Sequence, residues 1–222
     1  MEKTMNIAVV PGVGYSHLLP ILQFSKLLVK LHSYLHVICL IPTLGSLPTS
    51  SKTILQTLPS NINYTFLHPL HSKDLLPLGT TLETQLQLTV SHSLPSIHQA
   101  LKSLVLRTPL VALIVDSFAV EALDLAKEFN LLSYIYYPGA ATTLSLSLYL
   151  PKLDDETSCE YRDLTEPVKI SGCVPLHGRD LYAYAPTLVF LFLVWNEIMI
   201  IICKFKLIII DDTFYVCVTQ GC

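Results

Sequence analysis

The feature that most constrains the fold is a short apolar run near the amino terminus, followed directly by a glycine-containing loop. Residues 6–10 read Asn-Ile-Ala-Val-Val, and the loop after them reads Pro-Gly-Val-Gly-Tyr-Ser-His, ending at His17. A continuously apolar, β-branched run is typical of a strand buried on both faces of a parallel sheet. The loop at the carboxyl end of such a strand is where open α/β sheets bind ligands. An imidazole held there can serve as a base.

Predicted strands and helices alternate along most of the chain. We expect strands at 5–10, 36–41, 62–67, 109–115 and 133–137, and helices at 18–31, 50–58, 80–104, 118–129 and 139–150. Residues 68–79 are expected to form a loop, and residues 151–186 an irregular stretch. The alternation predicts an α/β fold with a doubly wound, mostly parallel sheet and right-handed crossovers.

Three of the expected helices contain a proline or end at one. Pro20 is expected in the first turn of the helix over 18–31, where a missing N–H does little harm. The helix over 80–104 is expected to break near Pro95, and the helix over 139–150 to stop at Pro151. The acidic cluster at 154–156 is most simply a solvated loop.

The bulk composition narrows the range of partners. A formal net charge of −3 offers no electrostatic basis for binding nucleic acid. The first residues lack the apolar core of a signal peptide, so we expect a cytoplasmic protein. The six cysteines have no CxxC spacing, and we interpret them as scattered free thiols.

The composition changes after residue 186. All 14 prolines and 7 of the 8 glycines lie at or before that position, and a long apolar run follows it. The run is long enough to suggest a membrane span, but Asn196 and Glu197 split it, and an acidic residue there costs about 2.5–3.5 kcal/mol on insertion scales. We therefore separate a domain over 1–186 from an apolar tail over 187–222 and expect no membrane partner.

Several separate motifs resemble one enzyme family. The segments 7–20 and 111–118 resemble the opening and a later strand of plant family-1 UDP-glycosyltransferases. The segments 150–154, 159–163 and 172–180 are similar to a subgroup of that family, the hydroquinone glucosyltransferases, which glucosylate small phenols. The motifs follow one another in the order and spacing of that family, and the resemblance covers about residues 5–182.

The resemblance implies a GT-B fold of two Rossmann-like domains facing across a cleft. The amino-terminal domain of that family binds the acceptor, and the carboxy-terminal domain binds UDP-glucose through a box rich in Trp, His, Gly, Glu and Gln. The single tryptophan here, Trp195, lies in the apolar tail, so the box is absent. We therefore expect 1–186 to be the acceptor-binding half, truncated and inactive on its own, with no cofactor beyond the UDP-glucose co-substrate.

By the same resemblance, His17 is the catalytic base and Asp116 is its partner. A neutral imidazole can take the proton of a phenol, and a carboxylate on its other nitrogen fixes the tautomer. Attack from the face opposite UDP would invert the anomeric centre. Taken alone, a residue like His17 is more often a loop histidine that packs or caps the helix, and one like Asp116 is more often a cap of the following helix. One departure is Ser16, where most of the family has glycine.

The resemblance also assigns Glu83, Phe118 and Leu181 to the acceptor pocket. The alternatives are a solvated helix face for Glu83, a core aromatic for Phe118 and a core leucine for Leu181. The residues themselves leave both interpretations open.

Other motifs are weaker. Gly12 and Gly14 do not make a GxGxxG fingerprint, so no dinucleotide cofactor is expected. His68 and His71 lack a third ligand, so no metal site is expected. The expected partners are a small phenolic acceptor, and a UDP-sugar only when a second domain is supplied. The alternatives are a non-catalytic phenol-binding or interaction fragment, and a tail-anchored membrane protein.

Overall fold

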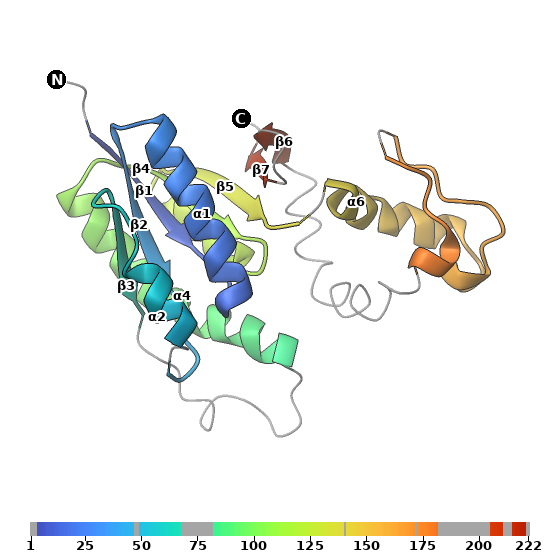
Figure 1. The fold of residues 1–222 in the computed structure, drawn as a ribbon, viewed down its shortest axis with the longest axis horizontal. Helices are drawn as coiled ribbons and strands as arrows, with labels where there is room; N and C mark the ends of the chain where they lie inside the picture. The colour runs from blue at the N-terminus through green and yellow to red at the C-terminus, as the bar shows by residue number, and fades with distance from the viewer. Residues whose placement is uncertain are drawn as a thin grey trace. The chain divides into compact units, whose positions relative to one another are not determined.

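The computed structural model describes residues 4–46, 49–67, 82–139, 141–171, 173–181, 205–210 and 215–220. The chain divides into two compact units that join between Pro138 and Gly139 (Figure 1). The first unit holds the sheet and the loop that ends at His17. Each unit is described separately below.

Five parallel strands form the core of the first unit. In chain order they are β1 (Met5–Val10), β2 (Leu35–Ile41), β3 (Ile62–Phe66), β4 (Leu110–Asp116) and β5 (Leu132–Tyr137). They lie side by side in the order β3-β2-β1-β4-β5, and all four pairings are parallel. The order reverses direction after β3, so β1 and β4 are neighbours although a hundred residues separate them. The predicted doubly wound parallel sheet is confirmed.

Helices cover both faces of this sheet. They are α1 (Tyr15–Leu31), α2 (Thr49–Leu55), α4 (Leu82–Arg107), the short η1 (Val120–Ala122) and α5 (Leu123–Glu128). Right-handed crossovers put α1 and α2 on one face and the later helices on the other. Accordingly α1 contacts α2 and α4 contacts η1, and Figure 1 shows α1 and α2 in front of the strands. The expected helix over 118–129 is thus a 3₁₀ turn followed by a shorter α-helix.

Helix α1 starts earlier than its apolar pattern predicts. Gly14 precedes the first turn with φ of 105° and ψ of 161°, a conformation that side chains disfavour. Its carbonyl accepts the N–H of Leu18 at 3.1 Å, so the first turn closes at once. The prediction for Pro20 is therefore wrong, because this residue lies beyond the first turn and its missing N–H leaves the Ser16 carbonyl without the usual helical donor.

The expected breaks at Pro95 and Pro151 are also wrong. Helix α4 runs without interruption through Pro95, and α6 (Ala141–Glu156) runs through Pro151. Burial on both sides of each proline accounts for this. In α4, Val90 and Ile97 are at most 1% exposed, and in α6, Leu150 and Leu153 pack into one cluster. The free energy of burying these side chains exceeds the roughly 3 kcal/mol that an interior proline costs.

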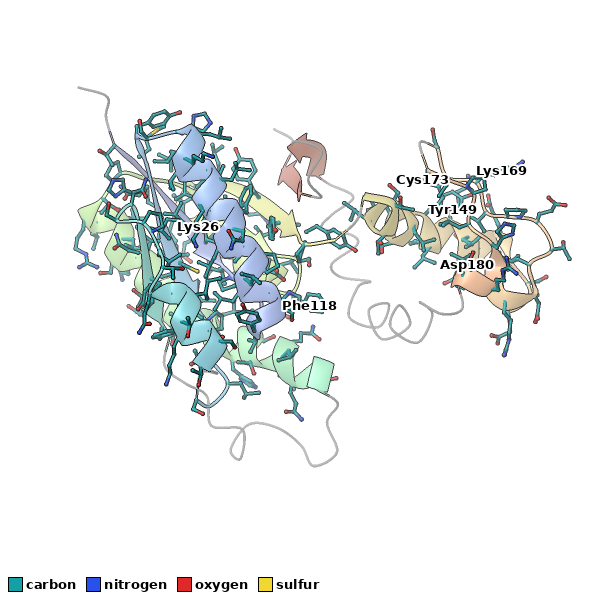
Figure 2. The ribbon with its side chains drawn as sticks, in the orientation of Figure 1. Lys26, Phe118, Tyr149, Lys169, Cys173 and Asp180 are labelled. Carbon is teal, nitrogen blue, oxygen red and sulfur yellow. The ribbon has the colours of Figure 1, made fainter. Side chains whose placement is uncertain are left out.

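The second unit has a small core of its own. Leu146, Leu150, Leu153, Val168 and Leu181 form a buried cluster between α6, an antiparallel bridge from Val168 to Leu176, and a helical turn over 178–181. Figure 2 labels Tyr149 and Asp180 of this unit. The acidic cluster 154–156, expected in a loop, forms the exposed last turn of α6, and Asp154 accepts a hydrogen bond from the Tyr161 hydroxyl.

Two further strands, β6 (Phe205–Ile210) and β7 (Tyr215–Gln220), lie in the carboxy-terminal segment. The boundary at 186, the split apolar run with Trp195, Asn196 and Glu197, and the predicted loop over 68–79 fall outside the described residues. The division at 186 therefore stays a prediction. Within the described ranges, none of the helices combines the length and hydrophobicity needed to traverse a bilayer.

Candidate active site at the ends of β1 and β4

The sheet brings two predicted site residues to one edge. Strands β1 and β4 pair in register, with Val10 opposite Val115, so both strands end at the same level. Asp116 is the last residue of β4, and His17 lies in the first turn of α1, just after the glycine loop that leaves β1. The parallel topology therefore brings both residues to the same edge of the sheet.

His17 and Asp116 are within hydrogen-bonding distance. The His17 Nδ1 atom lies 3.1 Å from Asp116 Oδ1 and 3.2 Å from Oδ2. The backbone N–H of Phe118 also donates to Oδ1, at 2.9 Å, which orients the carboxylate. Asp116 thus faces the imidazole and caps the following turn at the same time, so its two alternative interpretations are compatible. Its side chain is 0% exposed, whereas that of His17 is 17% exposed.

Two neighbours lie close against the imidazole. A Cβ atom built on Gly12 would lie 3.0 Å from Asp116 Oδ1 and 3.1 Å from His17 Cγ, so any side chain there would press on the pair. The Phe118 ring meets the imidazole edge to face, with centroids 4.7 Å apart, at the amino-terminal end of α1 (Figure 2). With Nδ1 turned to Asp116, Nε2 is the ring nitrogen that can take a proton from a ligand.

A cavity of about 190 Å³ is lined in part by the glycine loop that precedes His17, although neither His17 nor Asp116 is among its lining residues. Its walls are residues 12–14 of the glycine loop, Leu18 of α1, residues 41–46 at and beyond the end of β2, Ser51 of α2 and Leu86 of α4. The lining is mainly apolar, as is usual for pockets that bind small organic molecules.

No family model matches the sequence, but the chain is similar to several known proteins. The hydroquinone glucosyltransferase of Rauvolfia serpentina is 47% identical over 180 residues, which are 81% of this chain and 38% of that protein. UDP-glycosyltransferase 72B1 of Arabidopsis thaliana is 43% identical over 181 residues, with 81% and 37% covered. The chain thus spans less than two fifths of the length of these curated relatives.

Solved structures of plant UDP-glycosyltransferases also resemble this chain. UGT2 of Phytolacca americana, in complex with UDP-2-fluoro-glucose and pterostilbene, superposes with a TM-score of 0.73 at 38% identity over 81% of this chain and 41% of that one. A UDP-glucosyltransferase of Polygonum tinctorium gives a TM-score of 0.70 at 36% identity over 80% and 39%. The chain is homologous to the amino-terminal region of plant UDP-glycosyltransferases. Its fold is the corresponding α/β half of a GT-B enzyme.

The three predicted acceptor-pocket residues of this glycosyltransferase homologue lie in different parts of the structure. Phe118 contacts His17, as described above. Glu83 is the second residue of α4, and its side chain lies outside the described part of the structure. Leu181 is 1% exposed and lies in the core of the second unit, as the alternative interpretation of a core leucine expects. The pocket roles of all three stay predictions.

Three residues of the cavity wall could not be singled out from the sequence, namely Thr43, Ser51 and Leu86. These residues line the cavity but belong to three different segments, and none carries a motif of its own. Leu86 lies one helical turn after Glu83 in α4, which is the only signal that pointed toward it.

The described residues hold no group of three or more His, Cys, Asp or Glu side chains arranged to bind a metal. His68 and His71 lie outside those residues. Burial raises the pKa of the Cys39 thiol to about 12, so this cysteine is not a nucleophile.

The electrostatics of the pair favour a protonated imidazole. Burial lowers the pKa of His17, but the hydrogen bond to Asp116 and its charge outweigh that effect, so the pKa lies above the ordinary 6.5. The pair therefore stabilises the fold fully below pH 6.5, and this contribution is lost as the pH rises through the folded-state pKa. A base must be neutral, so His17 can accept a proton only above that same pKa.

We expect Asp116→Asn to reverse this shift. The substitution removes the negative charge but keeps the shape and burial of the site, so the pKa of His17 should fall below 6.5. An NMR titration of the imidazole Cε1–H resonance in the 222-residue chain measures both values. A wild-type pKa below 6.5, or one that the substitution leaves unchanged, would contradict the described geometry.

Proposed function

We propose that this chain is the acceptor-binding part of a UDP-glycosyltransferase that transfers glucose from UDP-glucose to the hydroxyl of a small phenol. The observation that carries the proposal is the His17–Asp116 pair, held at 3.1 Å at the carboxyl ends of β1 and β4, next to a glycine loop that lines an apolar cavity. The relative in Rauvolfia serpentina, named a hydroquinone glucosyltransferase, supports a phenolic acceptor.

The chemistry follows from the two ring nitrogens of His17. Neutral Nε2 takes the proton of the phenol, while Nδ1–H donates to Asp116. The charge of Asp116 stabilises the imidazolium that forms. The phenolic oxygen forms a bond to the anomeric carbon of the sugar as the bond from that carbon to the UDP oxygen breaks. Attack from the face opposite UDP inverts the anomeric configuration.

The acceptor side of this reaction falls to the domain over 1–186, with Glu83, Phe118 and Leu181 as further contacts to the phenol. The resemblance assigns the UDP-glucose site to a second domain, so the 222-residue chain alone should form little or no glucoside. We also propose a cytoplasmic location, because Cys39, Cys159 and Cys173 carry free thiols, which a reducing compartment preserves.

A chimera tests the proposal. Residues 1–181 are joined to the carboxy-terminal part of the Rauvolfia serpentina enzyme that follows its matched region, and the product is incubated with UDP-glucose and hydroquinone. We expect a β-linked glucoside from the α-linked donor, detected by liquid chromatography and NMR. A chimera that is folded, binds UDP-glucose and binds hydroquinone without transferring glucose would instead favour a non-catalytic phenol-binding protein.

A further inference from the structure

Phe118 contacts both members of the His17–Asp116 pair, with two different parts of the residue. Its backbone N–H donates to Asp116 Oδ1 at 2.9 Å. Its ring meets the imidazole of His17 with centroids 4.7 Å apart and an interplanar angle of 65°. This edge-to-face arrangement is one of the two that aromatic pairs prefer. Phe118 lies two residues beyond the end of β4, so the short turn after that strand sets both contacts.

The hydrogen bond to Asp116 does not by itself fix the plane of the imidazole. The torsion that joins a histidine ring to its Cβ atom is broad and roughly two-fold, so the ring can swing or turn over about that bond. In a turned ring a carbon atom faces the carboxylate, and Nδ1 points away from it. A base acts only when its free nitrogen is held within reach of the proton, and small displacements lower the rate strongly.

The described neighbours of the imidazole cover different parts of it. Asp116 faces the Nδ1 atom, and Gly12 lies beside the Cβ and Cγ atoms, where the ring is attached. Phe118 is the neighbour whose side chain packs on the ring itself. With these contacts in place, the His17 side chain is 17% exposed. Removing the Phe118 ring therefore opens space into which the imidazole can turn.

We propose that Phe118 is a positioning residue for His17, whose ring keeps the imidazole turned with Nδ1 toward Asp116 and Nε2 available to accept a proton. This inference rests on the proposed function for the use of Nε2 as a base. The contact acts on the imidazole and not on the acceptor, so its effect should be present in the chain without any ligand. It is thus separate from the contact with the phenol that the resemblance assigns to Phe118.

The test reads the tautomer of His17 in the full 222-residue chain, without donor or acceptor. Long-range ¹H–¹⁵N spectra of the imidazole nitrogens are recorded at a pH where the ring is neutral, and His17→Ala assigns its signals among the eight histidines. In the wild type, Nδ1 should carry the proton, because it faces the carboxylate. In Phe118→Ala the Nε2–H tautomer should appear, so the two nitrogen shifts should move toward each other.

Two further variants separate the ring contact from a general effect on the fold. Phe118→Tyr keeps the ring and should retain the wild-type nitrogen shifts. Phe129→Ala removes a ring whose centroid lies 5.3 Å from that of His98, beside a second histidine–carboxylate pair, and should leave the His17 signals unchanged. In the chimera, Phe118→Ala should lower kcat by about tenfold to 100-fold and leave the KM for UDP-glucose unchanged.

Phe118→Leu covers the case in which circular dichroism shows that the alanine variant does not fold. It keeps apolar bulk at the site but has no planar ring, so it should change the nitrogen shifts in the same direction. The inference is overturned when the folded ringless variants show the wild-type shifts, when Phe118→Tyr loses them, or when Phe129→Ala changes them equally. These spectra require no sugar transfer, so failure of this inference is distinct from a chimera that fails to form glucoside.

Discussion

Replacing His17 with alanine should lower kcat for hydroquinone in the chimera by about 100-fold to 10,000-fold, the usual contribution of a positioned general base. Alanine cannot accept the phenolic proton, and among the described residues His17 is the only titratable side chain hydrogen-bonded to Asp116. The KM for UDP-glucose should stay close to its original value. Initial rates of glucoside formation at pH 8 measure both quantities.

His98→Ala provides the matched control. His98 of α4 also pairs with a carboxylate, since its Nε2 atom lies 2.7 Å from Glu128, but this pair is exposed. The same substitution there should leave kcat unchanged. Equal rates for His17→Ala and His98→Ala would remove His17 from the reaction.

Asp116→Asn should have a smaller effect than His17→Ala and a different signature. The amide oxygen can still accept from the Phe118 N–H, so the side chain keeps its orientation, and the base itself is still present. The lost charge lowers the pKa of His17, so the acidic limb of the kcat/KM profile should move to lower pH. A reduced rate with an unmoved acidic limb would indicate that Asp116 acts only on the fold.

The contact between His17 and Asp116 could be predicted in part from sequence. Each residue follows an apolar run that forms a parallel strand, and parallel strands end at one edge of the sheet. The pattern of apolar runs in the sequence could not predict the order of the strands in the sheet. The pair meets because β1 and β4 are direct neighbours, and that adjacency depends on the crossover through α4.

The helix limits were predicted less well, for an energetic reason. A proline marks a break only where nothing compensates for the lost hydrogen bond. Around Pro95 and Pro151, buried side chains on both sides keep the helix continuous, and their burial depends on partners distant in sequence. The place of Ser51 in the cavity wall also depends on packing between segments distant in sequence. Serine is common on surfaces, and only the packing of α2 beside the glycine loop makes this hydroxyl part of a cavity wall.

The largest effect on stability is expected from Phe24→Ala. Phe24 of α1 is 2% exposed, and its ring stacks on that of Tyr136 in β5, with centroids 5.1 Å apart and an interplanar angle of 23°. Removing a buried phenylalanine deletes apolar burial and leaves a cavity, which costs about 3–5 kcal/mol. We therefore expect the free energy of unfolding, measured by circular dichroism in urea, to fall by that amount.

Leu31→Ala, on the same helix but at a position that is 60% exposed, should change the free energy of unfolding by less than about 0.5 kcal/mol. The contrast matters for the active site, because α1 carries His17 in its first turn and Phe24 two turns later. The stack on Tyr136 thus joins α1 to β5 and keeps the helix against the sheet, which fixes the imidazole relative to Asp116. A cost below about 1 kcal/mol for Phe24→Ala would show that another contact holds α1 in place.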